Sequence, residues 1–159
     1  MKTFLFVSAF LLMPLAIPAP AQEPAPVPVT PAAPVENAAR QAIEPFFERL
    51  SKNDIDGAYD ALLKGTKIAD SAADVSLLKT KTREAIKTFG PIAGGEFIEA
   101  KAVGAHLTRM IYLSLGRDFP MRWRFYFYEA QGRVRLVDIR ITDRLAEMFD
   151  EPALPAPTP

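Results

Sequence analysis

The sequence predicts an α+β fold in which three N-terminal helices pack on a curved four-stranded antiparallel meander. Apolar residues recur at helical spacing in the first half of the chain and alternate with polar residues in the second half. The period changes at Gly94-Gly95, and short Gly-bearing gaps separate the strand-like runs that follow. The 159 residues suit one ordinary domain, and the equal numbers of acidic and basic groups give no electrostatic argument for nucleic acid as a partner.

A secretory signal peptide is predicted over residues 1–21. Lys2 precedes an apolar run from Phe4 to Ile17, and Ala19-Pro20-Ala21 provides a small-residue cleavage site. The run is shorter than the roughly 20 residues that a membrane-spanning helix needs. We therefore expect cleavage before Gln22 rather than retention as an anchor. The mature protein should be periplasmic or secreted, with no stable membrane anchor.

Pro-rich segments flank the predicted domain, which covers residues 36–150. Residues 22–35 form a linker and residues 151–159 form a tail that we expect to be disordered, because such segments favour extended polyproline II and bury little surface. The alternative is that they are docking motifs for another protein. The chain has no cysteine, so the core alone must stabilise the domain.

Three helices are predicted before the change of period. The first begins near Glu36 and carries a one-sided apolar stripe, and Pro45 should kink or restart it. Asp54 can cap a second helix from Ile55 to Leu63. The third runs from about Asp74 to Phe89.

Four strands follow, and the turns between them set the predicted register. We expect a two-residue turn at Gly104-Ala105 and a three-residue turn at Ala130-Gln131-Gly132, because this choice gathers apolar residues on one face. The predicted strands are Phe97–Val103, His106–Leu115, Met121–Tyr128 and Val134–Thr142. Their predicted inner face comprises Ile98, Ala100, Ala102, Leu107, Arg109, Ile111, Leu113, Met121, Trp123, Phe125, Phe127, Arg135, Val137, Ile139 and Ile141.

This order of elements resembles the nuclear-transport-factor-2-like superfamily, a cone-shaped, cystatin-like α+β fold, and its uncharacterised exported branch in particular. The resemblance rests on Phe46-Phe47 in the first helix, the link Asn53 to Tyr59, and the strand Arg122 to Tyr128. The segment Gly65 to Ala73 is too short for the small hairpin that often precedes the third helix in that superfamily. The resemblance implies a cupped sheet and sheet-to-sheet homodimers. Because the superfamily includes isomerases, dehydratases and non-enzymatic domains, it does not select an activity.

The candidate ligand-binding site is the predicted cup, formed by Arg109, Trp123 and Phe125 with Tyr59 and Asp60 at its rim. No Asp, Glu, His or Tyr occupies the predicted inner strand positions, so the sheet offers no general acid or base. The single histidine and the absence of cysteine predict neither a metal site nor a cofactor.

Arg109 interrupts an otherwise apolar row and has three interpretations. The first is a salt bridge to a helix carboxylate (Glu44, Glu48 or Asp60), because a buried guanidinium must be paired. The second is an anchor for an anionic or carbonyl-bearing ligand. The third is a different register, which would place Arg109 outside the cup.

Aromatic and basic residues gather on the predicted outer face, a mixture that is typical of interfaces. The candidate dimer interface comprises Tyr112, Arg122, Arg124, Tyr126, Tyr128 and Leu136. The alternative is that the C-terminal segment of the same chain, Leu145 to Phe149, covers this face. Export argues against RNA as the ligand of the aromatic residues.

These patterns leave three functional hypotheses. The first is an exported, non-catalytic module that binds a small ligand or a protein and dimerises through the outer face. The alternative is a small enzyme of isomerase or dehydratase type that uses Tyr59 and Asp60 with Arg109. The third is an accessory domain whose Pro-rich tails recruit other proteins.

Overall fold

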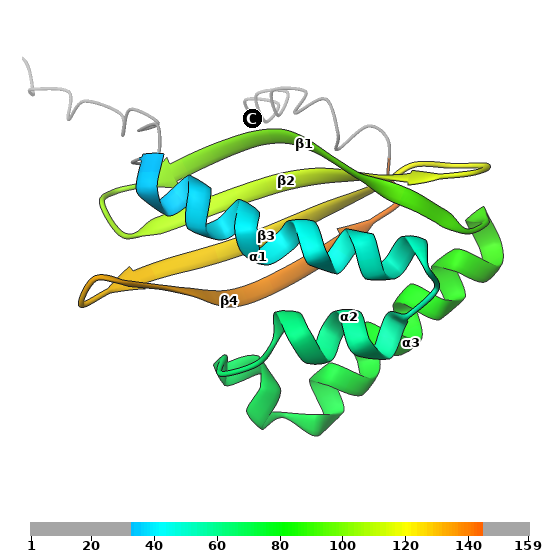
Figure 1. Ribbon diagram of the computed structural model, residues 1–159, viewed down its shortest axis with the longest axis horizontal. Helices are drawn as coiled ribbons and strands as arrows, with labels where there is room; N and C mark the ends of the chain where they lie inside the picture. Colours follow the sequence, from blue (N-terminus) through cyan, green and yellow to red (C-terminus); the bar gives the residue numbers. More distant parts are fainter. Residues whose placement is uncertain (1–32, 145–159) are drawn as a thin grey trace, which may run out of the picture.

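The computed structural model describes residues 33–144 and has three α-helices followed by a four-stranded antiparallel sheet (Figure 1). The predicted α+β class is therefore confirmed. The elements are α1 (Ala33–Ser51), α2 (Ile55–Leu62), a short 3₁₀ helix η1 (Lys67–Asp70), α3 (Ala72–Phe89), β1 (Ile92–Val103), β2 (Leu107–Gly116), β3 (Met121–Ala130) and β4 (Arg133–Thr142). The predicted signal peptide, the C-terminal tail, most of the linker and the segment Leu145 to Phe149 lie outside the described residues.

The helices follow the sequence signals closely. α1 begins at Ala33, before the predicted start, and is one helix through Pro45, so of the expected kink or restart the restart does not occur. The Asp54 side chain accepts a hydrogen bond of 2.9 Å from the backbone N–H of Gly57, which confirms the predicted cap of α2. α3 ends at Phe89, and the capping residue Gly90 adopts a φ of 84° that is unfavourable for other residues.

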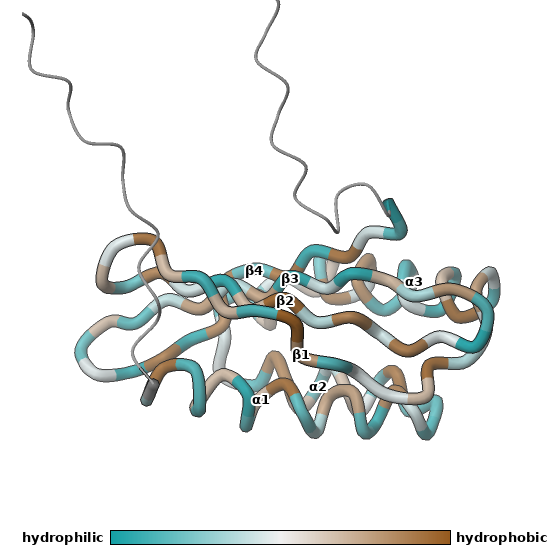
Figure 2. Tube along the Cα trace, turned by 90° about the horizontal axis from the view of Figure 1, so that it is seen from above, coloured by the Kyte–Doolittle hydropathy of each residue, from teal (hydrophilic) through white to brown (hydrophobic). Residues whose placement is uncertain are grey.

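The helices lie to one side of the sheet. α1 lies across one face, α2 packs against α1, and α3 packs beside α2 below the β4 edge (Figure 1). Figure 2, turned by 90°, shows α1 and α2 together on the same side of the strands. We call the face toward α1 the inner face and the opposite face the outer face.

The register between the first three strands differs from the prediction by one residue. Val103 pairs with Leu107, so the first turn contains three residues rather than two. Tyr112, and not Ile111, pairs with Trp123. β2 therefore turns Thr108, Met110, Tyr112 and Ser114 toward the helices, and all four are buried.

The last hairpin also has a different turn. Ala130 pairs with Arg133, so the turn has the two residues Gln131 and Gly132, at φ values of 53° and 68°. Positive φ at both positions matches the turn that best fits the twist of a two-residue hairpin. A bulge then places Val137 as an extra residue between the pairs Phe127–Leu136 and Tyr126–Asp138.

These differences correct the predicted faces. β3 presents Met121, Trp123, Phe125 and Phe127 inward as predicted, and Ile139 is also buried in the core. Two sets of residues were assigned to the wrong face. Those expected to face the cup that point away from it are Ile98, Leu107, Arg109, Ile111, Leu113, Arg135 and Val137. Those expected on the outer face that instead pack in or against the core are Phe97, Met110, Tyr112, Val134 and Leu136.

Candidate functional site

Aromatic rings fill the space between α1 and the sheet. Phe46 of α1 lies with its ring centroid 5.2 Å from that of Tyr59 and 5.4 Å from that of Trp123. The neighbouring Phe47 ring stacks on Tyr112 at 5.5 Å. These side chains are at most 3% exposed. The predicted cup is thus occupied by the protein's own core, and Trp123 and Phe125 are packing residues within it.

Tyr59 lies in this core and not at a rim, which corrects the prediction for this residue. Its hydroxyl is 2.7 Å from Thr82 Oγ1, and the Thr82 hydroxyl donates to the Leu78 carbonyl oxygen at 3.0 Å. Since the Thr82 proton is used there, the Tyr59 hydroxyl donates to Thr82. Burial raises the pKa of Tyr59 above its ordinary value, so the phenol stays protonated.

The buried hydroxyls of Tyr59 and Tyr112 form a natural pair for comparison, because the Tyr112 hydroxyl has no hydrogen-bond partner among residues 33–144. Burial also raises the pKa of Tyr112 to about 12. We expect Tyr59→Phe to lower the free energy of unfolding by about 1 kcal/mol, and Tyr112→Phe to leave it unchanged or raise it. Urea unfolding of both variants measures this difference. Equal losses would contradict the assignment of the Tyr59–Thr82 bond.

The residues of the enzyme hypothesis do not converge. Asp60 is exposed on α2 and binds Lys79 Nζ at 2.7 Å. Arg109 lies on the outer face, where its Nη2 donates to Glu99 Oε1 at 2.6 Å. The first interpretation of Arg109 had the right type of interaction but the wrong partner, and the third interpretation, an outward register, describes its position. Tyr59, Asp60 and Arg109 are therefore separated by the core and the sheet.

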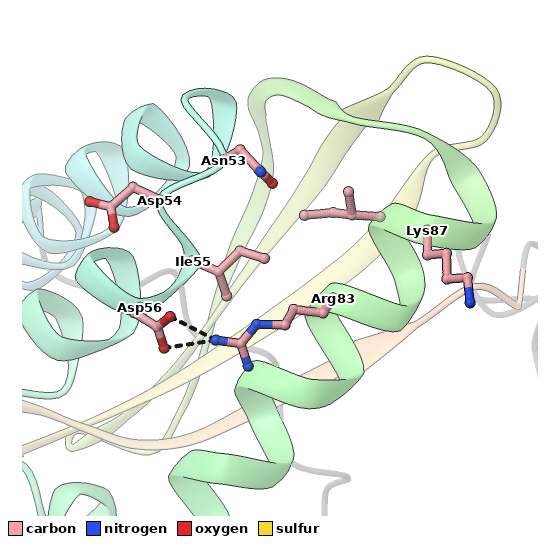
Figure 3. Close-up of a pocket in the computed structure, with 7 residues that line it drawn as sticks. Asn53, Asp54, Ile55, Asp56, Arg83 and Lys87 are labelled. Atoms are coloured by element: carbon pink, nitrogen blue, oxygen red, sulfur yellow. Dashed lines mark hydrogen bonds and ion pairs between the residues drawn. The ribbon is translucent and has the colours of Figure 1, made fainter.

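A charged cluster joins α2 to α3 beside a surface pocket of about 340 Å³ (Figure 3). Arg83 donates to both carboxylate oxygens of Asp56, at 2.7 and 2.9 Å, and Lys79 contacts Asp56 at 3.2 Å. The Arg83 hydrogen bond, followed by the Lys79 bond, lowers the pKa of Asp56. Because the two cations keep this carboxylate ionised, Asp56 is a poor proton donor. The cluster is a set of exposed ion pairs that link α2 to α3.

A second hollow, of about 440 Å³, separates α3 from β4. Its apolar lining comes from Leu77 and Leu78 of α3 and from Val137 and Ile139 of β4. Leu77 is 51% exposed and the bulged Val137 is 43% exposed. Charged residues also line the hollow: Asp74 and Lys81 of α3, and Asp138 and Arg140 of β4.

The outer face combines apolar and charged side chains. Its most exposed apolar residues form one cross-strand row at the end of the first hairpin, where Val103 pairs with Leu107 and Leu107 pairs with Tyr128. These three side chains are 66%, 37% and 45% exposed, respectively. We call Val103, Leu107 and Tyr128 the hairpin-end row.

Charged residues occupy the neighbouring rows of the outer face. Arg124 lies directly opposite Arg140, whose Nε donates to Asp138 at 2.8 Å. That hydrogen bond raises the pKa of Arg140. With Tyr126 and Ile141, these residues line a hollow of about 450 Å³. Of the predicted interface, Arg122, Arg124, Tyr126 and Tyr128 are on this face, whereas Tyr112 and Leu136 are in the core.

The outer face also carries an aliphatic strip that we did not expect: Leu107, Ile111, Leu113 and Leu115 of β2. The sequence does indicate that such a strip could exist, because β2 has apolar residues at both sets of alternate positions. Alternation alone cannot orient such a strand.

Residues 33–144 show no sign of a metal site or of a membrane-spanning helix. In that range, no three His, Asp or Glu side chains are grouped as a metal ion would require. Its helices are too short or too polar to cross a bilayer. In comparisons with protein-family models, with curated proteins and with solved structures, no match to this chain was found.

Proposed function

We propose that this protein is an exported, non-catalytic interaction module, and that a second copy of the chain binds the outer face of its sheet. The observation that carries the proposal is the hairpin-end row, in which three large apolar side chains lie side by side and exposed. Exposed apolar clusters rimmed by polar residues are typical of protein–protein interfaces. Arg135, which pairs with Tyr128, and Lys101 of β1 supply such a rim.

The protein-interaction form of the hypothesis is favoured over the small-ligand form. A ligand pocket needs a concave, largely preformed space. The space that would serve here is filled by Phe46, Phe47, Tyr112, Trp123 and Phe125. The isomerase or dehydratase alternative gains no support either, because its three proposed groups do not share a surface.

We also propose a distant relation to the nuclear-transport-factor-2-like superfamily. Three helices that precede an antiparallel meander, with Phe46-Phe47 packed on the strand that starts at Met121, support it. The relation makes a sheet-to-sheet homodimer the expected assembly. Two-fold symmetry then places the same patch on both subunits, so the hairpin-end row would face its own copy.

The test is the mass of the purified chain in solution at several concentrations, measured by sedimentation velocity. We expect a dimer, and we expect Tyr128→Glu to weaken it at least about tenfold, since a charge would be buried at the centre of the contact. Leu77→Glu is the control, because Leu77 is 51% exposed but lies on α3, away from the row. A monomer at every concentration, or equal weakening by both variants, would contradict the proposal.

A further inference from the structure

The middle of the outer face is buried, although no element within residues 33–144 lies over it. Ile111 is 5% exposed and Arg122 is 4% exposed. Both side chains point outward by register, because Ile111 is opposite Arg124 and Arg122 is opposite Leu113. The described helices lie on the inner face or beside the β4 edge (Figures 1 and 2). An outward-facing position becomes this inaccessible only when something covers it.

We infer that the segment that follows β4, residues 145–151, lies across the outer face over Ile111 and Arg122. The path of the chain supports this segment. β4 ends at Thr142, and Thr142 pairs with Arg122. The chain therefore leaves the sheet next to the buried patch, and a few residues suffice to reach it at about 3.3 Å per residue.

The composition of the segment matches the surface that it would cover. Leu145, Met148 and Phe149 have the i, i+3, i+4 spacing of one apolar face, which suits the aliphatic side chains of Ile111 and Leu113. The acidic residues of the segment are Glu147, Asp150 and Glu151.

Those carboxylates suit the basic character of the patch. Arg122 and Arg124 lie next to one another on the outer face of β3, and Arg140 is opposite Arg124. A charged guanidinium group can be buried when carboxylates pair with it. It binds a carboxylate through two parallel hydrogen bonds in one plane. A second copy would instead bring its own arginines against these, and like charges at an interface are costly.

The segment before α1 fits the patch less well. Residues 22–32 consist largely of Pro, Ala and Val and contain a single acidic residue, Glu23. The inference leaves the hairpin-end row uncovered, since that row lies at the opposite end of β2 from Leu113. It therefore does not depend on the proposed homodimer, and the two can fail separately.

The absence of cysteine permits a direct test with single thiols in the full chain. The reporter is Ile111→Cys, and the measured quantity is its rate of alkylation by iodoacetamide. Leu77→Cys reports an exposed thiol, because Leu77 is 51% exposed. Met110→Cys reports global unfolding, because Met110 is 0% exposed on the inner face. We expect the Ile111→Cys thiol to react at least about tenfold more slowly than the Leu77→Cys thiol, as a site does that is open only in a minor population.

Displacing the segment should then expose the reporter. In the Ile111→Cys background, Phe149→Asp, or the joint change Glu147→Lys, Asp150→Lys and Glu151→Lys, should raise the alkylation rate at least about tenfold. The Met110→Cys rate should not change. An initially fast Ile111→Cys thiol, or a slow one that neither change accelerates, overturns the inference. A rate that falls as protein concentration rises also overturns it, because the cover is then the second copy.

Discussion

Replacing Trp123 by alanine should lower the free energy of unfolding by about 3–5 kcal/mol. The indole is completely buried at the centre of the sheet, where it contacts the rings of Phe46 and Phe47 edge-on and stacks on Phe125. α1 contributes two of these rings, so the helix and the sheet would both border the cavity and neither could close it alone. An ordinary domain has about 5–15 kcal/mol in total, so the variant should be marginal.

One feature of Trp123 reduces this loss. Its indole N–H is buried and has no hydrogen-bond partner among the described residues. Removing an unsatisfied donor recovers about 1 kcal/mol or more, so the lower half of the range is expected. Chemical denaturation measures the change. Tyr128→Ala is the matched control, since that aromatic residue is on the same strand but 45% exposed. Equal stability of the two variants would mean that Trp123 is not at the centre of the core.

Replacing Gly95 by alanine should cost about 1–3 kcal/mol, the usual penalty for overpacking a well-filled core. A Cβ atom at this position would overlap the ring of Phe47. That ring cannot move aside easily, because it is 3% exposed and stacks on Tyr112. The glycine is thus required by the close approach of β1 to α1.

Gly94 provides the control for this prediction. A Cβ atom there would meet nothing within 4 Å, so Gly94→Ala should be neutral or slightly stabilising. The difference between the two variants in thermal or urea unfolding isolates the contact with Phe47. If Gly95→Ala were as stable as Gly94→Ala, α1 would have to lie farther from β1 than the structure places it.

The sequence by itself determined the elements and much of the helical face. The cap at Asp54, the stop at Gly90 and the apolar stripe of α1 are local signals, and each acts within a few residues of its own position. β3 was equally well determined, because its large side chains at Trp123, Phe125 and Phe127 alternate with Arg122 and Arg124. A strand with one clearly apolar face has one orientation.

Only the tertiary structure decided the orientation of β2. Both sets of its alternate residues are apolar, so our prediction depended on the length of the turn at Gly104-Ala105, and the structure has three residues there rather than two. The structure buries Met110 and Tyr112, because the Tyr112 ring fills the space above Phe47, and leaves the aliphatic strip outside.

The orientation of β2 also determines which residues lie on the candidate interface. The bulge at Val137 similarly moved Leu136 into the core and Arg135 out of it. Local sequence limits what a strand can pair with, but helix α1, distant in sequence, selects which face is buried. The reason is that the fit between aromatic rings depends on their shapes. An alternating pattern of apolar and polar residues shows only which side chains are apolar, and not which of them fit together.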